Sequence, residues 1–501
     1  MTTKRQKKER KQIIVNAFDM GTPGLQSPGL WKHPKDKSRD YNTIEYWVNL
    51  AKLLEKGKFN ALFIADVLGP YDVYNGPRNL TAAAKAGAQW PINEPSAVVS
   101  AMAAVTKNLS FAVTSSTISE APYHFARRLA TLDRLTKGRV GWNIVSSYLD
   151  SASRNLLNGE PLPPHDERYE KAEEYLEVIY QLFLSSWADD AVQLDLQKGA
   201  FSDPQRIREI NYEGKHFKVP GPFICEPNPY QRLPVILQAG ASTKGMEYAA
   251  KHAEAVFING NTPEGLKSKI DKLNSLIRKH GRNPDDVKKV QLVTVIVAPT
   301  YEEAVEKFKD YKQYADVEGA QALFGGWTGV DLGQYDWDQE LDQVESNAVR
   351  SFADMMIKPF PGDPPDIKKT RGYIANKLSI GGSGVLFIGS PTDVADEIEN
   401  WVDVAGVDGF NFTYAITPGS FEDIVDLLIP ELQRRGLVWD DYPKEDLTFR
   451  ENLYGIDRED ATFLKPDHPA YNLRWKEGET RQEFEAKLEK TLKENFASKE
   501  E

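Results

Sequence analysis

Short apolar segments alternate with amphipathic helical patterns along most of this sequence. Segments 61–65, 109–114 and 235–239 are typical of buried strands, and each is followed by a pattern typical of a helix. This order of strand and helix predicts a parallel sheet covered by helices. About eight such strand–helix units can be counted, which favours an α/β fold of the closed (β/α)8 TIM-barrel type over an open sheet.

The helix expected after segment 385–388 has clear end signals. Ser390 stands at the N-cap, Pro391 at the first helical position and Asp393 at the third, and Gly406 follows the last turn. Local signals of this kind predict where a helix begins and ends from the neighbouring residues alone.

Two connections are too long for simple loops between a strand and a helix. We expect insertions over about 148–233, after the fourth strand, and over about 315–383, after the seventh. The barrel with its insertions is predicted to span 13–436. A basic tail at 1–12 precedes it, and a C-terminal extension over 437–501 carries one expected amphipathic helix.

Composition and charge exclude several classes of protein. The net charge of −12 disfavours binding to a phosphate backbone. The single cysteine, Cys225, excludes an intramolecular disulfide and fits a reducing compartment. No apolar run approaches the ~20 residues that span a bilayer. We therefore expect a soluble, cytoplasmic protein that binds neither nucleic acid nor a membrane.

In a parallel barrel, functional groups gather at the carboxyl ends of the strands. The polar residues expected there are Asp66, Thr114, Ser115, Ser116, Asn143, Ser146, Ser147, Gln238 and Ser242. A glycosidase would need two carboxylates at these ends, and Asp66 is the one clear candidate. The seven histidines show no metal-ligand spacing, so no metal site is expected, and a G-x-S-x-G motif is absent. Hydroxyls and amides favour a polar cofactor that supplies its own chemistry.

Two sequence features are suited to binding a phosphate group. Segment 240–242, Gly-Ala-Ser, opens a helix directly after a strand, where backbone N–H groups and the Ser242 hydroxyl can approach an anion. His165 and Tyr169 are four residues apart and share one face of a helix. Taken alone, the first feature also fits an ordinary helix cap and the second a surface pair. The glycine-rich segment 381–384 lacks the spacing of a dinucleotide fingerprint and is expected to be a loop.

Longer motifs resemble one known family. They are Gly29-Leu30-Trp31-Lys32-His33-Pro34, Pro122-Tyr123-His124, Gly138-Arg139-Val140-Gly141-Trp142-Asn143-Ile144-Val145-Ser146-Ser147, Gln238-Ala239-Gly240-Ala241-Ser242 and Pro430-Glu431-Leu432-Gln433-Arg434-Arg435-Gly436. The resemblance covers roughly 13–453. The family is that of nitrilotriacetate monooxygenase, long-chain alkane monooxygenase, dibenzothiophene-sulfone monooxygenase and pristinamycin synthase, in the bacterial-luciferase-like superfamily.

This resemblance implies a luciferase-like (β/α)8 barrel that binds FMN and forms a homodimer or higher homo-oligomer. Reduced FMN would come from a separate NAD(P)H-dependent flavin reductase. The flavin would react with O2 through a C4a-peroxyflavin and oxygenate a small organic substrate. The protein would then be an enzyme, a flavin-dependent monooxygenase.

The resemblance also implies roles for particular residues. The family's FMN-contacting positions match Asp66, Thr114, His165, Tyr169 and Ser242. Of these, His165, Tyr169 and Ser242 match the phosphate end, whereas Thr114, together with Asn143, is expected nearer the flavin ring. The family commonly has threonine at the position of Ser146, where the hydroxyl is kept, and segment 157–164 is less typical of the family.

Two alternatives remain open from the sequence. The first is a barrel that retains flavin without turnover, and the second is an oxidoreductase of the same superfamily that uses deazaflavin. An ordinary barrel hydrolase is disfavoured because carboxylates are scarce at the expected strand ends. No residue stands out as a catalytic acid or base, and the sequence does not identify the substrate.

Overall fold

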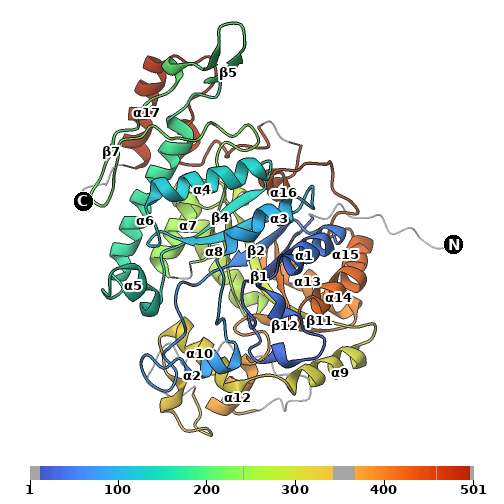
Figure 1. Ribbon diagram of the computed structural model, residues 1–501. Coiled ribbons are helices and arrows are strands. Elements are labelled where there is room, and N and C mark those ends of the chain that lie inside the picture. Colours follow the sequence, from blue (N-terminus) through green and yellow to red (C-terminus); the bar gives the residue numbers. More distant parts are fainter. Residues whose placement is uncertain (1–11, 241, 342–366, 458–459, 497–501) are drawn as a thin grey trace, which may run out of the picture.

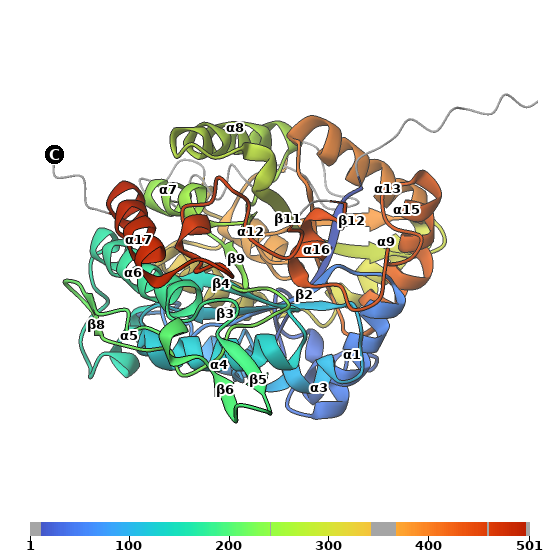
Figure 2. The ribbon, with the colours of Figure 1, turned by 90° about the horizontal axis from the view of Figure 1, so that it is seen from above.

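The computed structural model describes residues 12–240, 242–341, 367–457 and 460–496. The described strands of the main sheet are all parallel, and helices surround them (Figure 2). Eight strands close into a ring, in the order β1 (Ile14–Met20), β2 (Ala61–Ala65), β3 (Ser110–Ser116), β4 (Val140–Val145), β9 (Val235–Gln238), β10 (Ala255–Phe257), β11 (Lys288–Val297) and β13 (Gly409–Thr413), with β13 pairing back to β1. The expected (β/α)8 barrel is therefore confirmed.

A ninth strand, β12 (Val385–Gly389), pairs only with the second half of β11. Within β11, Val293 and Thr294 pair with β12 and also with β13, so β12 and β13 lie on opposite sides of β11. The side that β12 takes is the one that β10 occupies at the start of β11. Strand β10 has three residues and reaches only Val290, which leaves the rest of that side free for β12.

Helices with clear end signals cover the barrel. They include α1 (Ile44–Lys56), α4 (Pro122–Leu135), α7 (Thr243–His252), α8 (Pro263–Lys279), α9 (Tyr301–Lys312), α13 (Pro391–Asn400) and α15 (Ile429–Arg435). The capping box predicted at the start of α13 is formed, because Ser390 accepts from the Asp393 N–H and Asp393 accepts from the Ser390 N–H. Past Asn400 the same helix continues as one wider turn to Ala405 and ends at Gly406, as predicted.

The barrel interior is apolar in its middle layer and polar above it. Phe18 and Phe63 stack at 5.1 Å between ring centroids, and Phe63 contacts Phe257 at 4.3 Å. The next interior layer toward the carboxyl ends of the strands contains Thr114 and Asn143, which are direct partners in the register of β3 and β4. The polar layer therefore begins where a ligand at the carboxyl ends would meet the barrel.

The start of the first long connection packs against the second, because Leu149 and Ala152 share an apolar cluster with Ala322 and Leu323. The rest of the first connection extends away from the second (Figure 1). The first carries α5 (Asp150–Leu156), α6 (His165–Tyr180) and a hairpin of β5 (Val192–Asp195) and β6 (Ala200–Ser202). The second carries α10 (Val317–Thr328) and α12 (Arg371–Leu378), and α10 packs against α2 (Thr81–Ala86) through Ala322 and Leu323. Among the described residues, no helix combines the length and the apolar character that crossing a bilayer requires.

The C-terminal extension packs against the barrel. Helix α16 (Phe449–Tyr454) covers the amino-terminal end of β4, where a Cβ atom on Gly141 would come within 2.6 Å of the Phe449 ring. Arg450 and Glu254 form an ion pair of which both side chains are fully buried, with 2.6 Å between Nε and Oε1. Further along, α17 (Arg481–Asn495) buries Phe484, whose ring stacks on Trp475 at 5.0 Å.

Replacing Arg450 by alanine should lower the free energy of unfolding by about 3–5 kcal/mol, because Glu254 would be left as an unpaired buried charge. Chemical denaturation followed by circular dichroism measures this loss. Lys493→Ala is the control, since the Lys493–Glu489 pair is exposed and should contribute less than about 1 kcal/mol. Equal losses in both variants would contradict the role given to the buried pair.

Candidate functional site

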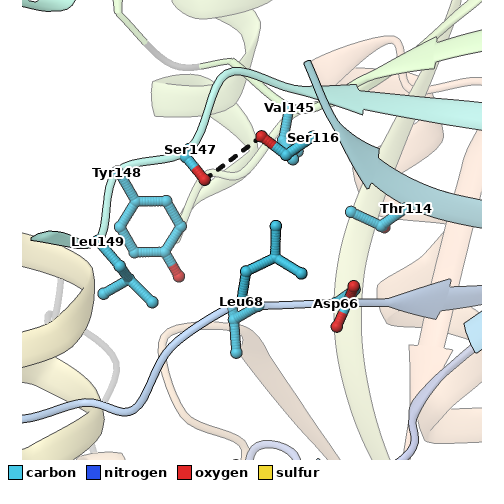
Figure 3. A pocket seen from close by; sticks show the side chains of 9 residues that line it. Asp66, Leu68, Thr114, Ser116, Val145, Ser147, Tyr148 and Leu149 are labelled. Atoms are coloured by element: carbon cyan, nitrogen blue, oxygen red, sulfur yellow. Dashed lines mark hydrogen bonds between the residues drawn. The ribbon is translucent and has the colours of Figure 1, made fainter. Parts of the chain in front are cut away.

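A pocket lies at the carboxyl ends of β2, β3 and β4 (Figure 3). The space between its lining atoms amounts to about 350 Å³, a figure that includes space open to solvent. Its lining residues are Asp66, Val67, Leu68, Thr114, Ser116, Val145, Ser147, Tyr148 and Leu149. Four of the residues expected at the strand ends, Asp66, Thr114, Ser116 and Ser147, are therefore brought together in one cavity.

Asp66 follows the last residue of β2 and lies largely buried in this pocket. Burial raises the pKa of its carboxyl group to about 8, and the negative charge of Glu94 adds to the rise. The backbone N–H of Val67 and the charge of Arg128 oppose this shift only in part. At neutral pH the Asp66 side chain is therefore mostly a neutral carboxylic acid, which can donate a hydrogen bond.

Thr114 and Asn143 form a polar pair beside Asp66. The Asn143 Nδ2 group donates to Thr114 Oγ1 at 3.0 Å, and the two residues are only 5% and 2% exposed. The Asn143 Oδ1 atom is buried and accepts no hydrogen bond from the described residues. An unsatisfied buried acceptor costs free energy, so this atom indicates a missing donor at the barrel mouth.

His165 and Ser242 meet although 77 positions separate them in the sequence. His165 Nε2 lies 3.1 Å from Ser242 Oγ, and its Nδ1 lies 2.9 Å from Asp166 Oδ1. The Asp166 carboxylate can only accept, so Nδ1 carries a proton, and in the neutral imidazole Nε2 accepts from the Ser242 hydroxyl. The same contact lowers the pKa of Asp166.

The amino terminus of α7 completes this second cluster. Ser242 is its N-cap and accepts from the Gly245 N–H at 3.0 Å. A Cβ atom on Gly245 would lie 2.7 Å from the Tyr169 hydroxyl, so glycine is required for this close approach. The Tyr169 ring lies 5.0 Å from His165 and 5.7 Å from Tyr248, which together fix its orientation. Uncapped N–H groups and hydroxyls at a helix start are suited to binding an anion.

Arg168 is a residue of this region that the sequence analysis did not select. It stands on α6 directly before Tyr169 and is only 8% exposed, and its Nε and Nη1 groups are buried and have no acceptor among the described residues. Burial lowers its pKa, and the ionisable group that acts on its charge is Tyr169. A buried guanidinium without an acid partner indicates a missing anion. The sequence signal that could have identified Arg168 was its position on the same helix, three residues after His165.

The two clusters belong to one arc of the barrel. Strands β2, β3, β4 and β9 are consecutive neighbours in the ring, and their carboxyl ends lead to Asp66, Thr114, Asn143 and Ser242 in that order. Neutral polar groups occupy the first part of the arc, and a cluster whose chemistry is suited to binding an anion occupies the end of it. In the described ranges, His, Cys, Asp and Glu side chains form no cluster of three that could hold a metal ion.

Comparison with known proteins identifies the same family as the motifs. A family model described as luciferase-like monooxygenase matches residues 26–408. The chain is 45% identical over 465 residues to the dimethyl-sulfide monooxygenase of Hyphomicrobium sulfonivorans, covering 93% of this chain and 94% of that protein. It is 46% identical over 447 residues to the long-chain alkane monooxygenase of Geobacillus thermodenitrificans strain NG80-2, covering 89% and 94%.

Solved structures agree with these relatives. The crystal structure of DmoA from Hyphomicrobium sulfonivorans matches with a TM-score of 0.86 at 44% identity, covering 93% of this chain and 96% of that chain. The structure of riboflavin lyase RcaE with modified FMN and riboflavin matches with a TM-score of 0.82 at 31% identity, covering 93% and 100%. The expectation of a monooxygenase on a luciferase-like barrel is confirmed, and the chain belongs to the luciferase-like monooxygenase family.

Proposed function

We propose that this protein is the oxygenase component of a two-component, FMN-dependent monooxygenase. The observation that carries the proposal is the arc of four consecutive strand ends, which joins neutral polar groups to an anion-binding cluster. FMN has the same two parts, a neutral polar ring system and a phosphate. The similarity to a dimethyl-sulfide monooxygenase and a long-chain alkane monooxygenase supports oxygenation of a small organic molecule.

The residues of the arc fit FMN in three respects. Asn143 Oδ1 lacks a donor, and the N–H groups of a flavin ring can supply one. The buried Arg168 lacks an acid, which a phosphate would provide. Gly245 leaves space beside the Ser242 and Tyr169 hydroxyls that a Cβ atom would fill. A modified FMN in the structure of a relative that is 31% identical gives independent support.

Each group then has a defined task. His165, Tyr169, Ser242 and Arg168 hold the phosphate, while Thr114 and Asn143 orient the ring. Asp66, as a neutral acid, donates a hydrogen bond without placing a negative charge beside the cofactor. Reduced FMN supplies the electrons that activate O2, and the protein's part is to orient the ring and exclude water from it.

The electrons are proposed to come from a separate NAD(P)H-dependent flavin reductase. No G-x-G-x-x-G fingerprint occurs in the sequence, and the glycine-rich segment 381–384 is a tight turn in which Gly381 and Gly382 have φ values of 80° and 57°. A cytoplasmic location and a homodimer or higher homo-oligomer, both typical of the family, complete the proposal.

The double variant Ser242→Ala/Tyr169→Phe should weaken FMN binding at least tenfold, since each hydroxyl lost from a charged phosphate costs about 1.5–3 kcal/mol. Flavin fluorescence titration measures the affinity, and O2 uptake with an added flavin reductase and candidate substrates tests the activity. Thr262→Ala is the matched control. Thr262 caps α8 as Ser242 caps α7, but it follows β10 and so lies outside the arc formed by the ends of β2, β3, β4 and β9. Unchanged FMN affinity in the double variant would exclude this phosphate site.

Arg168→Met should have opposite effects on binding and stability. FMN affinity should fall at least tenfold, because the phosphate loses its cationic partner. The free energy of unfolding of the ligand-free protein should rise by about 1 kcal/mol or more, because a desolvated and unpaired charge is removed. Arg232→Met is the control, since Arg232 is equally buried but donates to Asp189 at 2.8 Å and should lose stability when replaced. Lower stability with unchanged FMN affinity would make Arg168 purely structural.

Asp66→Asn should reveal the raised pKa of the wild-type carboxyl through the pH dependence of stability. An acid whose pKa rises from 3.8 to about 8 on folding stabilises the protein fully below pH 4 and loses this contribution as the pH passes 8. The free energy of unfolding of Asp66→Asn, relative to that of the wild type, should therefore rise by more than about 1.4 kcal/mol between pH 4 and pH 8. Thermal unfolding across this range provides the measurement.

The control for this experiment is Glu431→Gln. Hydrogen bonds from Arg434 and Arg435 lower the pKa of Glu431 to about 2, so its contribution is complete above pH 5 and constant from pH 6 to pH 8. If the difference in stability between Asp66→Asn and the wild type does not change between pH 4 and pH 8, the raised pKa of Asp66 is contradicted.

A further inference from the structure

The pocket has two walls of different origin (Figure 3). Asp66 and Thr114 come from the barrel strands and are the residues proposed to face the flavin. On the opposite side, Leu68, Tyr148 and Leu149 form what we call the outer wall. Leu149 belongs to a small apolar cluster, separate from the barrel core, in which the chain after β2 and after β4 packs against α2 and α10; Leu68 packs on this cluster.

The polar atom of the outer wall is already used by a chain of hydrogen bonds. The Gln89 amide nitrogen donates to the Leu25 carbonyl at 2.6 Å, so its oxygen faces Tyr71. The Tyr71 hydroxyl donates to that oxygen at 2.7 Å. The hydroxyls of Tyr71 and Tyr148 are 2.9 Å apart. Because the single hydroxyl proton of Tyr71 is already donated to Gln89, Tyr148 must donate to Tyr71.

Tyr148 is therefore fixed so that its ring, and no free hydroxyl proton, faces the pocket. Tyr148 is 48% exposed, and part of its surface lines the cavity. The backbone supports this orientation, because Ser147 has a φ of 62°, a left-handed conformation that a serine adopts only when its surroundings impose it. The outer wall consequently offers leucine methyl groups and an aromatic face.

The charges around the pocket disfavour an ionic ligand. None of the nine residues that line it is Lys, Arg or His. Asp66 is held as a neutral acid by burial and by nearby Glu94, and the cation that acts on it, Arg128, is already paired with Glu120. A carboxylate or sulfonate placed here would lose its hydration without gaining a cationic partner.

We propose that the outer wall of Leu68, Tyr148 and Leu149 is the substrate-binding surface and that it selects small, uncharged and mainly apolar substrates. This inference rests on the proposed function, in which the flavin occupies the Asp66 and Thr114 side. A thioether or a hydrocarbon of a few carbon atoms has the required chemistry, whereas an aminopolycarboxylate does not. Binding gains come from apolar area removed from water.

The test compares two ligands of the same shape on the FMN-loaded protein. Methyl propyl sulfide and 3-(methylthio)propanoate differ by a methyl group in place of a carboxylate. Each is titrated while the absorbance spectrum of the bound, oxidised FMN is followed, so that no turnover is needed. The uncharged sulfide should bind at least tenfold more tightly than the carboxylate.

Two substitutions of Leu68 then locate the binding surface. Leu68→Lys introduces a cation into the outer wall and should change the ratio of the two affinities at least tenfold in favour of the carboxylate. Leu68→Met keeps volume and polarity and should keep the wild-type ratio. Leu68 is partly exposed, and circular dichroism together with FMN affinity verifies that both variants fold.

The outcomes separate this inference from the proposed function. Equal affinities of the two ligands for the wild type, or an unchanged ratio in Leu68→Lys, would overturn the outer wall as the selective surface while FMN binding stands. A flavin spectrum that neither ligand perturbs would do the same. Failure of the wild-type protein to bind FMN would overturn the proposed function itself and the inference with it.

Discussion

Closure of the parallel ring is the constraint on which the rest of this structure depends. Each strand pairs with neighbours on both sides, so all carboxyl ends point to one face of the barrel. Asp66 and Ser242, far apart in the sequence, become members of one arc because β2, β3, β4 and β9 are consecutive in the ring. The pairing of Thr114 with Asn143 is a direct result of the register of β3 and β4.

The ends of single helices were predictable from local sequence, and the closed barrel was predictable from the repeated order of strands and helices, but the irregular pairing of β12 was not. The capping box at Ser390 and the helix end at Gly406 lie where the sequence placed them, because each involves residues within one or two turns. The position of β12 depends on β10 being only three residues long, which leaves part of β11 unpaired. No periodicity within segment 385–388 contains that information.

The candidate site shows the same division. His165, Tyr169 and Ser242 were predicted from motifs, and the structure brings them together at the start of α7. Arg168 was missed because an arginine in the first turn of a helix is normally a surface residue, and its burial arises only from tertiary packing. Tyr148 was missed because its orientation depends on Tyr71, which is 77 positions away.

The distribution of charge along the arc is compatible with the anionic cofactor proposed above, although the chain as a whole is acidic. The net charge of −12 would repel a phosphate at long range, but screening confines that effect to about 8 Å at physiological ionic strength. At the amino terminus of α7, where the phosphate site is proposed, the buried guanidinium of Arg168 and the helix start favour a negative charge. At the pocket, Asp66 is neutralised instead of being paired with a cation. A cation there would favour anionic ligands at the ring end as well. A cationic group at the proposed phosphate end and neutral groups at the proposed ring end would therefore suit the same barrel to a charged cofactor and an uncharged second molecule.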